Sequence, residues 1–198
     1  STSLPDVTFN ATATAGAASR LLGFSSQTQS GIVAGAALTV SQRPAVRVTD
    51  AEGNPVTGAV VTFRVAQDGS SGYLTSSDTI ATASTNANGI ASVGAWTMPT
   101  TSGTSATAIA SISGVAETVT FTVTTTAGAV SRLRITAGGL STLSTTAGAT
   151  ASTITITALD ANNNTVTSYG GAKSLTFSGA TAAPNTTVPT VDGVNFST

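Results

Sequence analysis

The stretch VTFNATATAGAASRL, residues 7–21, returns almost unchanged as VTFTVTTTAGAVSRL at residues 119–133. At this spacing of 112 the two copies agree at 11 of 15 positions. Self-similarity at a fixed spacing is typical of proteins built from repeated structural units. Because a spacing of this size matches one small domain, we expect each copy to mark a boundary between two units.

A second pair of matching segments supports the same division. Residues 50–57 (DAEGNPVT) and 160–167 (DANNNTVT) agree at 5 of 8 positions. The division predicts a complete unit over residues 17–128 and a second unit over 129–198 that is incomplete on its own. Residues 1–16 are then either the terminal strand of a preceding unit or a donor strand for another sheet.

The chain is rich in residues that favour strands and turns, and polar and apolar residues alternate in many segments. In 58–66 (GAVVTFRVA), for example, Ala59, Val61, Phe63 and Val65 share one face. Short alternating segments separated by Asp, Asn and Gly turns are typical of a β-sandwich. The segments expected to form strands are 18–25, 36–40, 44–49, 58–66, 79–84, 89–98, 104–112, 116–126, 131–136, 151–159 and 173–178. We therefore predict an all-β protein of tandem immunoglobulin-like antiparallel β-sandwiches with Greek-key connections.

Composition excludes several classes of function. Charged residues make up 8% of the chain and the net charge is −1, so there is no broad basic face for nucleic acid. The chain has no Cys and no His, which removes thiolate nucleophiles, Ser–His pairs and the common zinc sites. No apolar run approaches the length of about 18 residues that a membrane helix needs. We expect no cofactor and no membrane insertion.

Three stretches together resemble a known family. They are VTDAEGNPVTGAVVTFRV, TNANGIASVGAWTM and SATAIASISGVAETVTFTV. This combination resembles the bacterial immunoglobulin-like group-one domains of invasins and intimins, over 17–128 well and over 129–198 more loosely. The resemblance implies an extracellular, rod-forming repeat of a bacterial surface protein that acts as a stalk or adhesive spacer without catalysis. It carries no catalytic residues over to this chain.

Two turns contain oxygen-bearing side chains that could ligate calcium. One holds Asp50, Glu52 and Asn54, and the other holds Asp160 with two asparagines, Asn162 and Asn164. Calcium takes six to eight oxygen ligands, and neither turn has more than two carboxylates. A hairpin turn in which Asp and Asn bond their own backbone is the favoured interpretation, so we predict no metal site.

No pattern in the chain indicates an enzyme. Glycoside hydrolysis needs two carboxylates across one cleft, whereas most acids here lie in turns (Asp50, Asp68, Asp78, Asp160 and Asp192). A Ser–Lys pair using Lys173 has no supporting motif. Trp96 is expected to be a core residue, because its neighbourhood alternates like a strand, rather than a platform for sugar stacking.

The segment at the N-terminal end offers the candidate interface. Val7, Phe9, Ala11 and Ala13 alternate on one face, so an extended strand here could add to an open sheet. The expected partners are neighbouring immunoglobulin-like domains or identical subunits, the latter giving a head-to-tail filament. Two other functions stay open at this point: a carbohydrate-binding accessory module and a virion surface decoration domain.

Overall fold

The computed structural model describes residues 8–139, 141, 153–174 and 195–196, and this part of the chain is all-β as predicted. Its strands are β1 (Arg20–Gly23), β2 (Thr28–Val33), β3 (Ala45–Thr49), β4 (Val60–Val65), β5 (Ile80–Ser84), β6 (Ile90–Ser92), β7 (Ser105–Ile112), β8 (Val119–Thr126), β9 (Arg132–Ala137), β10 (Ile154–Leu159), β11 (Gly171–Ala172) and β12 (Asn195–Phe196). One 3-10 turn, η1 (Val40–Gln42), lies between β2 and β3. None of the described residues belongs to a helix that could span a membrane.

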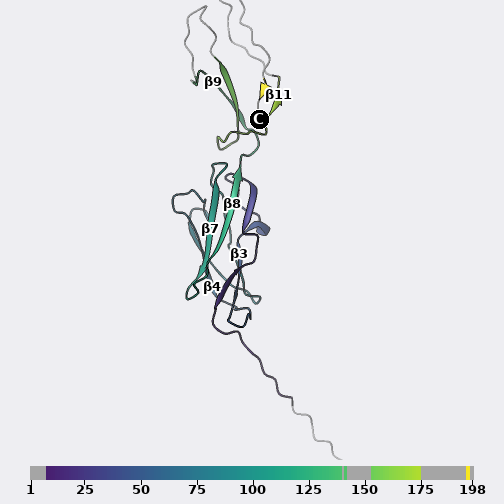
Figure 1. The fold of residues 1–198 in the computed structure, drawn as a ribbon, viewed down its shortest axis with the longest axis vertical. Helices are drawn as coiled ribbons and strands as arrows, with labels where there is room; N and C mark the ends of the chain where they lie inside the picture. The colour runs from purple at the N-terminus through teal and green to yellow at the C-terminus, as the bar shows by residue number, and fades with distance from the viewer. Residues whose placement is uncertain (1–7, 140, 142–152, 175–194, 197–198) are drawn as a thin grey trace, which may run out of the picture.

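Strands β1 to β8 form a β-sandwich, which we call the first sandwich (Figure 1). One sheet has the order β1-β3-β6 and the other has the order β2-β8-β7-β4-β5. Neighbouring strands are antiparallel except for β2 and β8, which run parallel. The parallel pair follows from a crossover, because the chain leaves β1 at Gly23 in one sheet and enters β2 at Thr28 in the other.

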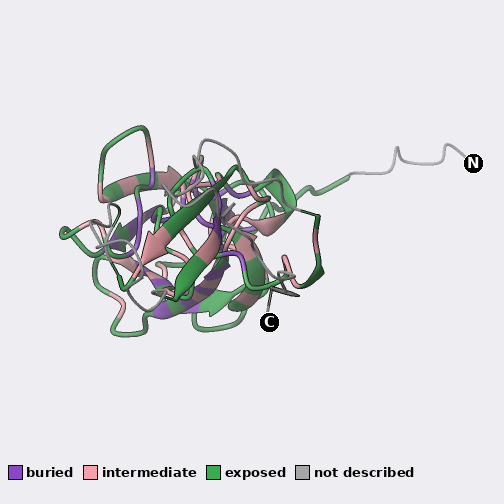
Figure 2. Cartoon of the chain, turned by 90° about the horizontal axis from the view of Figure 1, so that it is seen from above, coloured by how far each residue is buried: buried purple, intermediate pink, exposed green. Residues whose placement is uncertain are grey.

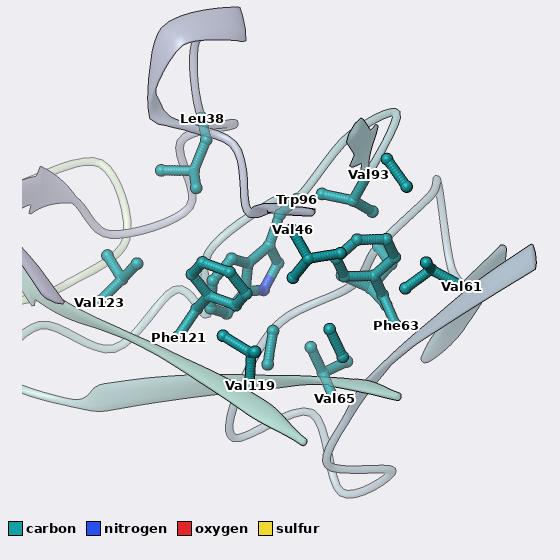
Figure 3. Close-up of a cluster of buried hydrophobic side chains, with 14 of the residues drawn as sticks. Leu38, Val46, Val61, Phe63, Val65, Val93, Trp96, Val119, Phe121 and Val123 are labelled. Carbon is teal, nitrogen blue, oxygen red and sulfur yellow. The ribbon is translucent and has the colours of Figure 1, made fainter. Parts of the chain in front are cut away.

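The core lies between the two sheets, and the alternation of apolar residues determines which side chains reach it. In β4 the residues predicted to point inward are Val61, Phe63 and Val65, and all are buried. In β8 Phe121 is only 1% exposed. Figure 3 shows the side chains of both sheets meeting around Trp96. The buried cluster also includes Leu21, Leu38, Val46, Val48, Leu74, Ala91, Val93, Met98, Ala106, Ala108, Ala110, Val119 and Val123.

Trp96 is a core residue, as predicted, but it reaches the core from a loop. Its side chain is fully buried and its Nε1 donates a hydrogen bond to the carbonyl oxygen of Ser71 at 2.8 Å. The predicted strand 89–98 is wrong beyond Ser92, where β6 ends. After Ser92 the chain still buries apolar side chains, but its backbone no longer pairs continuously with another strand. The alternation of apolar residues therefore could not show where the strand ends.

Two further differences from the predicted strands concern the first sandwich. Residues 36–40 form no strand: this prediction is wrong, because Ala37 makes only an isolated bridge with Thr97 before η1 begins. Strand β2 was not predicted, because it is polar and mostly exposed. The predicted strands 18–25, 44–49, 58–66, 79–84, 104–112 and 116–126 contain β1, β3, β4, β5, β7 and β8.

Beyond β8, the described part of residues 129–198 repeats the start of the first sandwich. β9 pairs with β10 in the same antiparallel way as β1 pairs with β3. The register is also the same: Arg20 pairs with Thr49, the residue before Asp50, and Arg132 pairs with Leu159, the residue before Asp160. β11 pairs with β12.

The predicted strand 131–136 overlaps β9, and 151–159 contains β10. Residues 173–174, the described part of the predicted strand 173–178, form no strand, so the prediction is wrong there. Residues 151–152 and 175–178 lie outside the described residues.

Candidate functional site

The two matching turns of the sequence fold in the same way. In the first, which follows β3, Asp50 Oδ1 accepts hydrogen bonds from the main-chain N–H groups of Glu52 at 3.1 Å and Asn54 at 2.8 Å. Asp50 Oδ2 accepts one from Asn54 Nδ2 at 3.0 Å. The carboxylate therefore holds its own turn closed, as the hairpin-turn interpretation predicts.

The second turn follows β10 and repeats these contacts around Asp160. Its Oδ1 accepts from the N–H groups of Asn162 at 2.9 Å and Asn164 at 2.8 Å, and its Oδ2 accepts from Asn164 Nδ2 at 2.9 Å. Both turns need one residue in the left-handed region, and the chain supplies Gly53 (φ 88°) in one and Asn163 (φ 70°) in the other. Glycine and asparagine are the residues that tolerate this conformation best.

Each aspartate also binds the linker that precedes its unit. Asp50 Oδ2 accepts a hydrogen bond from the N–H of Gly16 at 2.9 Å, and Asp160 Oδ2 accepts one from the N–H of Gly128 at 2.9 Å. These two glycines are equivalent residues of the repeated fifteen-residue segment. In each unit the repeated segment thus contacts the repeated turn. We call this contact, Gly16 with Asp50 and Gly128 with Asp160, the Asp–Gly clamp.

The hydrogen bonds of the clamp lower the pKa of both aspartates. The side-chain amide of Asn164, and then the N–H of Gly128, stabilise the charged form of Asp160 and lower its pKa from 3.8 to about 2. The pKa of Asp50 is lowered in the same direction by the Asn54 amide and the Gly16 N–H. Burial opposes this in both cases, and the hydrogen bonds outweigh it.

This geometry argues against calcium at either turn. Each carboxylate accepts four N–H donors, about as many as its lone pairs can serve, so little remains for a cation. Among the described residues there is also no group of three or more acidic side chains that could hold a metal ion. The turns use their oxygens to fix the backbone.

The asparagines of the second turn contact the first sandwich. Asn162 Nδ2 donates to the carbonyl oxygen of Ala34 at 3.0 Å. Asn164 Nδ2 donates to the carbonyl oxygen of Thr100 at 2.9 Å, and Asn164 Oδ1 accepts from the N–H of Ser102 at 2.9 Å. These three bonds join the second unit to the end of the first sandwich where β2 ends and β7 is about to begin.

Two glycines leave room for this junction. A Cβ added to Gly35, at φ +80°, would lie 2.9 Å from Asn162 Nδ2. A Cβ added to Gly128 would lie 3.2 Å from a methyl group of Val33. The two units therefore approach each other closely through main chain and amide groups, and we take this junction as the candidate functional site.

The residues predicted to donate a strand lie at the other end of the first sandwich. Figure 1 shows that residues 8–16 leave the sandwich at the end opposite β9. Phe9 is 89% exposed, Ala11 and Ala13 are exposed as well, and none of the described strands pairs with them. Figure 2 shows this exposed segment projecting away from the rest of the molecule. Val7 lies outside the described residues.

Sequence reasoning found the two turns and missed what their asparagines do. It considered Asn162 and Asn164 as possible ligands of a cation, whereas they bind main-chain groups of the first sandwich. The signal that could have revealed the junction is the pairing of two repeats, since each Ala-Gly linker is followed by one Asp-Ala-x-x-Asn turn. The partners of the asparagines carry no motif.

Comparison with known proteins gives two solved structures. The chain is similar to "Structure of surface layer protein SbsC, domains 1-6", at 18% identity and a TM-score of 0.33, with 76% of this chain and 17% of that chain covered. It is likewise similar to "Structure of surface layer protein SbsC, domains 4-9", at 18% identity and a TM-score of 0.34, with 76% and 21% covered. The chain thus spans about a fifth of the length of these proteins. No model of a protein family and no curated protein matches it.

Proposed function

We propose that this chain is a non-catalytic structural module of an extracellular bacterial surface protein, in which immunoglobulin-like sandwiches follow one another in a hydrogen-bonded row. The observation that carries the proposal is the junction, where Asn162 and Asn164 bind main-chain groups of the first sandwich. A spacer has to transmit orientation from one unit to the next, and directional bonds between units do this better than a free linker.

Three features of the sequence support this role. The chain is poor in charge and has neither His nor Cys, so it lacks the imidazole and thiolate groups on which many catalytic sites depend. Three stretches within residues 17–128 resemble bacterial immunoglobulin-like group-one domains, and this resemblance implies a rod-forming repeat at a cell surface. The proposed units are residues 17–128 and 129–198, and the proposed partners are neighbouring units of the same kind.

The proposal predicts a fixed orientation between the two units. The chain has no cysteine, so a spin-label pair can be introduced at two exposed positions through Ser84→Cys in β5 and Thr155→Cys in β10. We expect a single narrow distance distribution by pulsed electron paramagnetic resonance. Asn162→Ala should broaden it, because this side chain bonds Ala34 and has no side-chain bond within its own turn.

The control is Asn54→Ala in the first turn. It removes the same bond within the turn that Asn164→Ala removes, but it lies away from the junction. Asn164→Ala should broaden the distribution, and Asn54→Ala should leave it unchanged. A broad distribution in the parent chain would refute the proposed function, since the units would then be joined by a free linker.

A further inference from the structure

The Asp50 turn is built like the turn that forms the junction, yet the described residues place no unit against it. Asn54 corresponds to Asn164 and makes the same bond inside its turn. Asn164 is half-buried and bonds Thr100 and Ser102 through its remaining groups. Asn54 is exposed, and its Oδ1 has no hydrogen-bond partner among the described residues.

The segment that leads into this turn has the pattern of a buried strand. Residues 7–14 correspond to β8, in which Phe121 is 1% exposed and lies in the core. Phe9 is the equivalent of Phe121 and is 89% exposed. Burial of an apolar side chain is favourable, so a sheet that took up this segment would be stabilised by the burial of Phe9.

The clamp connects these two observations. In the junction described above, β8 ends at Thr126, and Gly128 two residues later bonds Asp160. Asn164 of the same turn then bonds the sandwich that contains β8. The same order of parts recurs at the other end of the first sandwich. A strand-like segment is followed by Gly16, which bonds Asp50, and then by Asn54, whose Oδ1 has no hydrogen-bond partner among the described residues.

We infer that Asn54 and the Asp50 turn form the docking face for a preceding sandwich of the same polypeptide, and that residues 8–14 are the last strand of that sandwich. This inference rests on the proposed function, because it extends the same row by one unit. The preceding sandwich would present a main-chain carbonyl and an N–H two residues apart, as Thr100 and Ser102 do. Glu52 stands where Asn162 stands in the second turn, so a donor on the partner would replace the Ala34 carbonyl.

The test extends the chain by one unit. A second copy of residues 17–118 replaces residues 1–6 and is fused directly ahead of Val7, so that residues 7–14 follow the copy as β8 follows residue 118. We expect amide hydrogen exchange of residues 8–14 to slow by about a hundredfold or more relative to the unextended chain, because the segment enters a sheet. Unchanged exchange in the extended chain would overturn the inference.

The docking face is tested separately in the extended chain. Spin labels at Ser84→Cys and at the corresponding position of the added copy should give a narrow distance distribution. Asn54→Ala should broaden it, and Ser77→Ala, in the exposed loop between β4 and β5, should not. Slowed exchange with no effect of Asn54→Ala would overturn the role of Asn54. A second result would also overturn the role of Asn54. If Asn54→Ala in the unextended chain abolished the unfolding transition that Trp96 fluorescence reports, Asn54 would be needed for the folding of its own unit.

The same measurements separate this inference from the proposed function. The function fails if the junction at Asn162 and Asn164 is loose in the unextended chain. Only the further inference fails if that junction is tight and the added unit is loose. Concentration-dependent polymers of the unextended chain, blocked by Phe9→Asp, would also overturn it, because the partner of residues 8–14 would then be a second copy of this chain.

Discussion

Phe9 and Phe121 are equivalent residues in two different environments, and this makes them a matched pair for mutation. Phe121 lies in the core of the first sandwich at 1% exposure, whereas Phe9 is 89% exposed. Truncating a buried Phe to Ala removes its transfer free energy and leaves a cavity, together about 3–5 kcal/mol. An exposed side chain without partners contributes within about 0.5 kcal/mol. We expect Phe121→Ala to destabilise the first sandwich by the larger amount and Phe9→Ala to leave it unchanged.

Trp96 supplies the assay, because it is the single tryptophan of the chain and is fully buried in the first sandwich. Its fluorescence during urea unfolding therefore reports this sandwich. For a slope of about 1–3 kcal/mol per molar urea, Phe121→Ala should lower the midpoint by about 1 M or more. If Phe9→Ala shifted the midpoint by an equal amount, residues 8–14 would contribute to the stability of the first sandwich, and the prediction would be refuted.

Three more predictions follow from the turns and loops. NMR titration should show Asp160 protonating near pH 2, so its contribution to stability is complete above about pH 5 and lost as the pH falls toward 2. The pKa of Asp50 is lowered in the same direction, so its contribution is also lost in acid. For Asp160, a midpoint at the ordinary value of 3.8 would contradict this. Gly72→Ala should cost about 3 kcal/mol or more by urea unfolding, because the new Cβ would meet the Thr97 carbonyl oxygen at φ +71°. Gly53→Asn should cost less than about 1 kcal/mol by urea unfolding, because no atom lies within 4 Å of the new Cβ and asparagine tolerates the left-handed region, as Asn163 does at φ 70° in the second turn.

The strands that the sequence predicts well are those with one buried and one exposed face. In β4, β7 and β8 the apolar residues alternate, and the structure buries every second side chain. The prediction fails where this physical cause is missing. Strand β2 is polar and lies at the edge of its sheet, and the loop after Ser92 buries Trp96 and Met98 without forming a ladder.

The candidate site was partly predictable for a related reason. An Asp-Ala-x-x-Asn turn encodes its own hydrogen bonds, because donor and acceptor are four residues apart or fewer. The bonds of Asn162 and Asn164 to the first sandwich join main-chain groups 62 to 128 residues away. Main-chain carbonyls and N–H groups occur at every residue of a loop, so no side-chain pattern identifies Ala34 or Thr100 as a partner.

The two copies of the repeated segment show that a strand depends on its neighbours more than on its own residues. Residues 119–126 form β8, whereas residues 8–14 pair with no described strand although they share most of its pattern. Ordering an extended backbone costs about 1–2 kcal/mol per residue, and only pairing and burial in a sheet can offset it. The clamp forms in both places, because Gly16 and Gly128 each meet an aspartate of the unit that follows them. The linker therefore belongs structurally to the unit that follows it, whereas β8 belongs to the first sandwich, so the boundary between these two units lies just after Thr126. The preceding sandwich that we infer would end at the equivalent residue, Thr14.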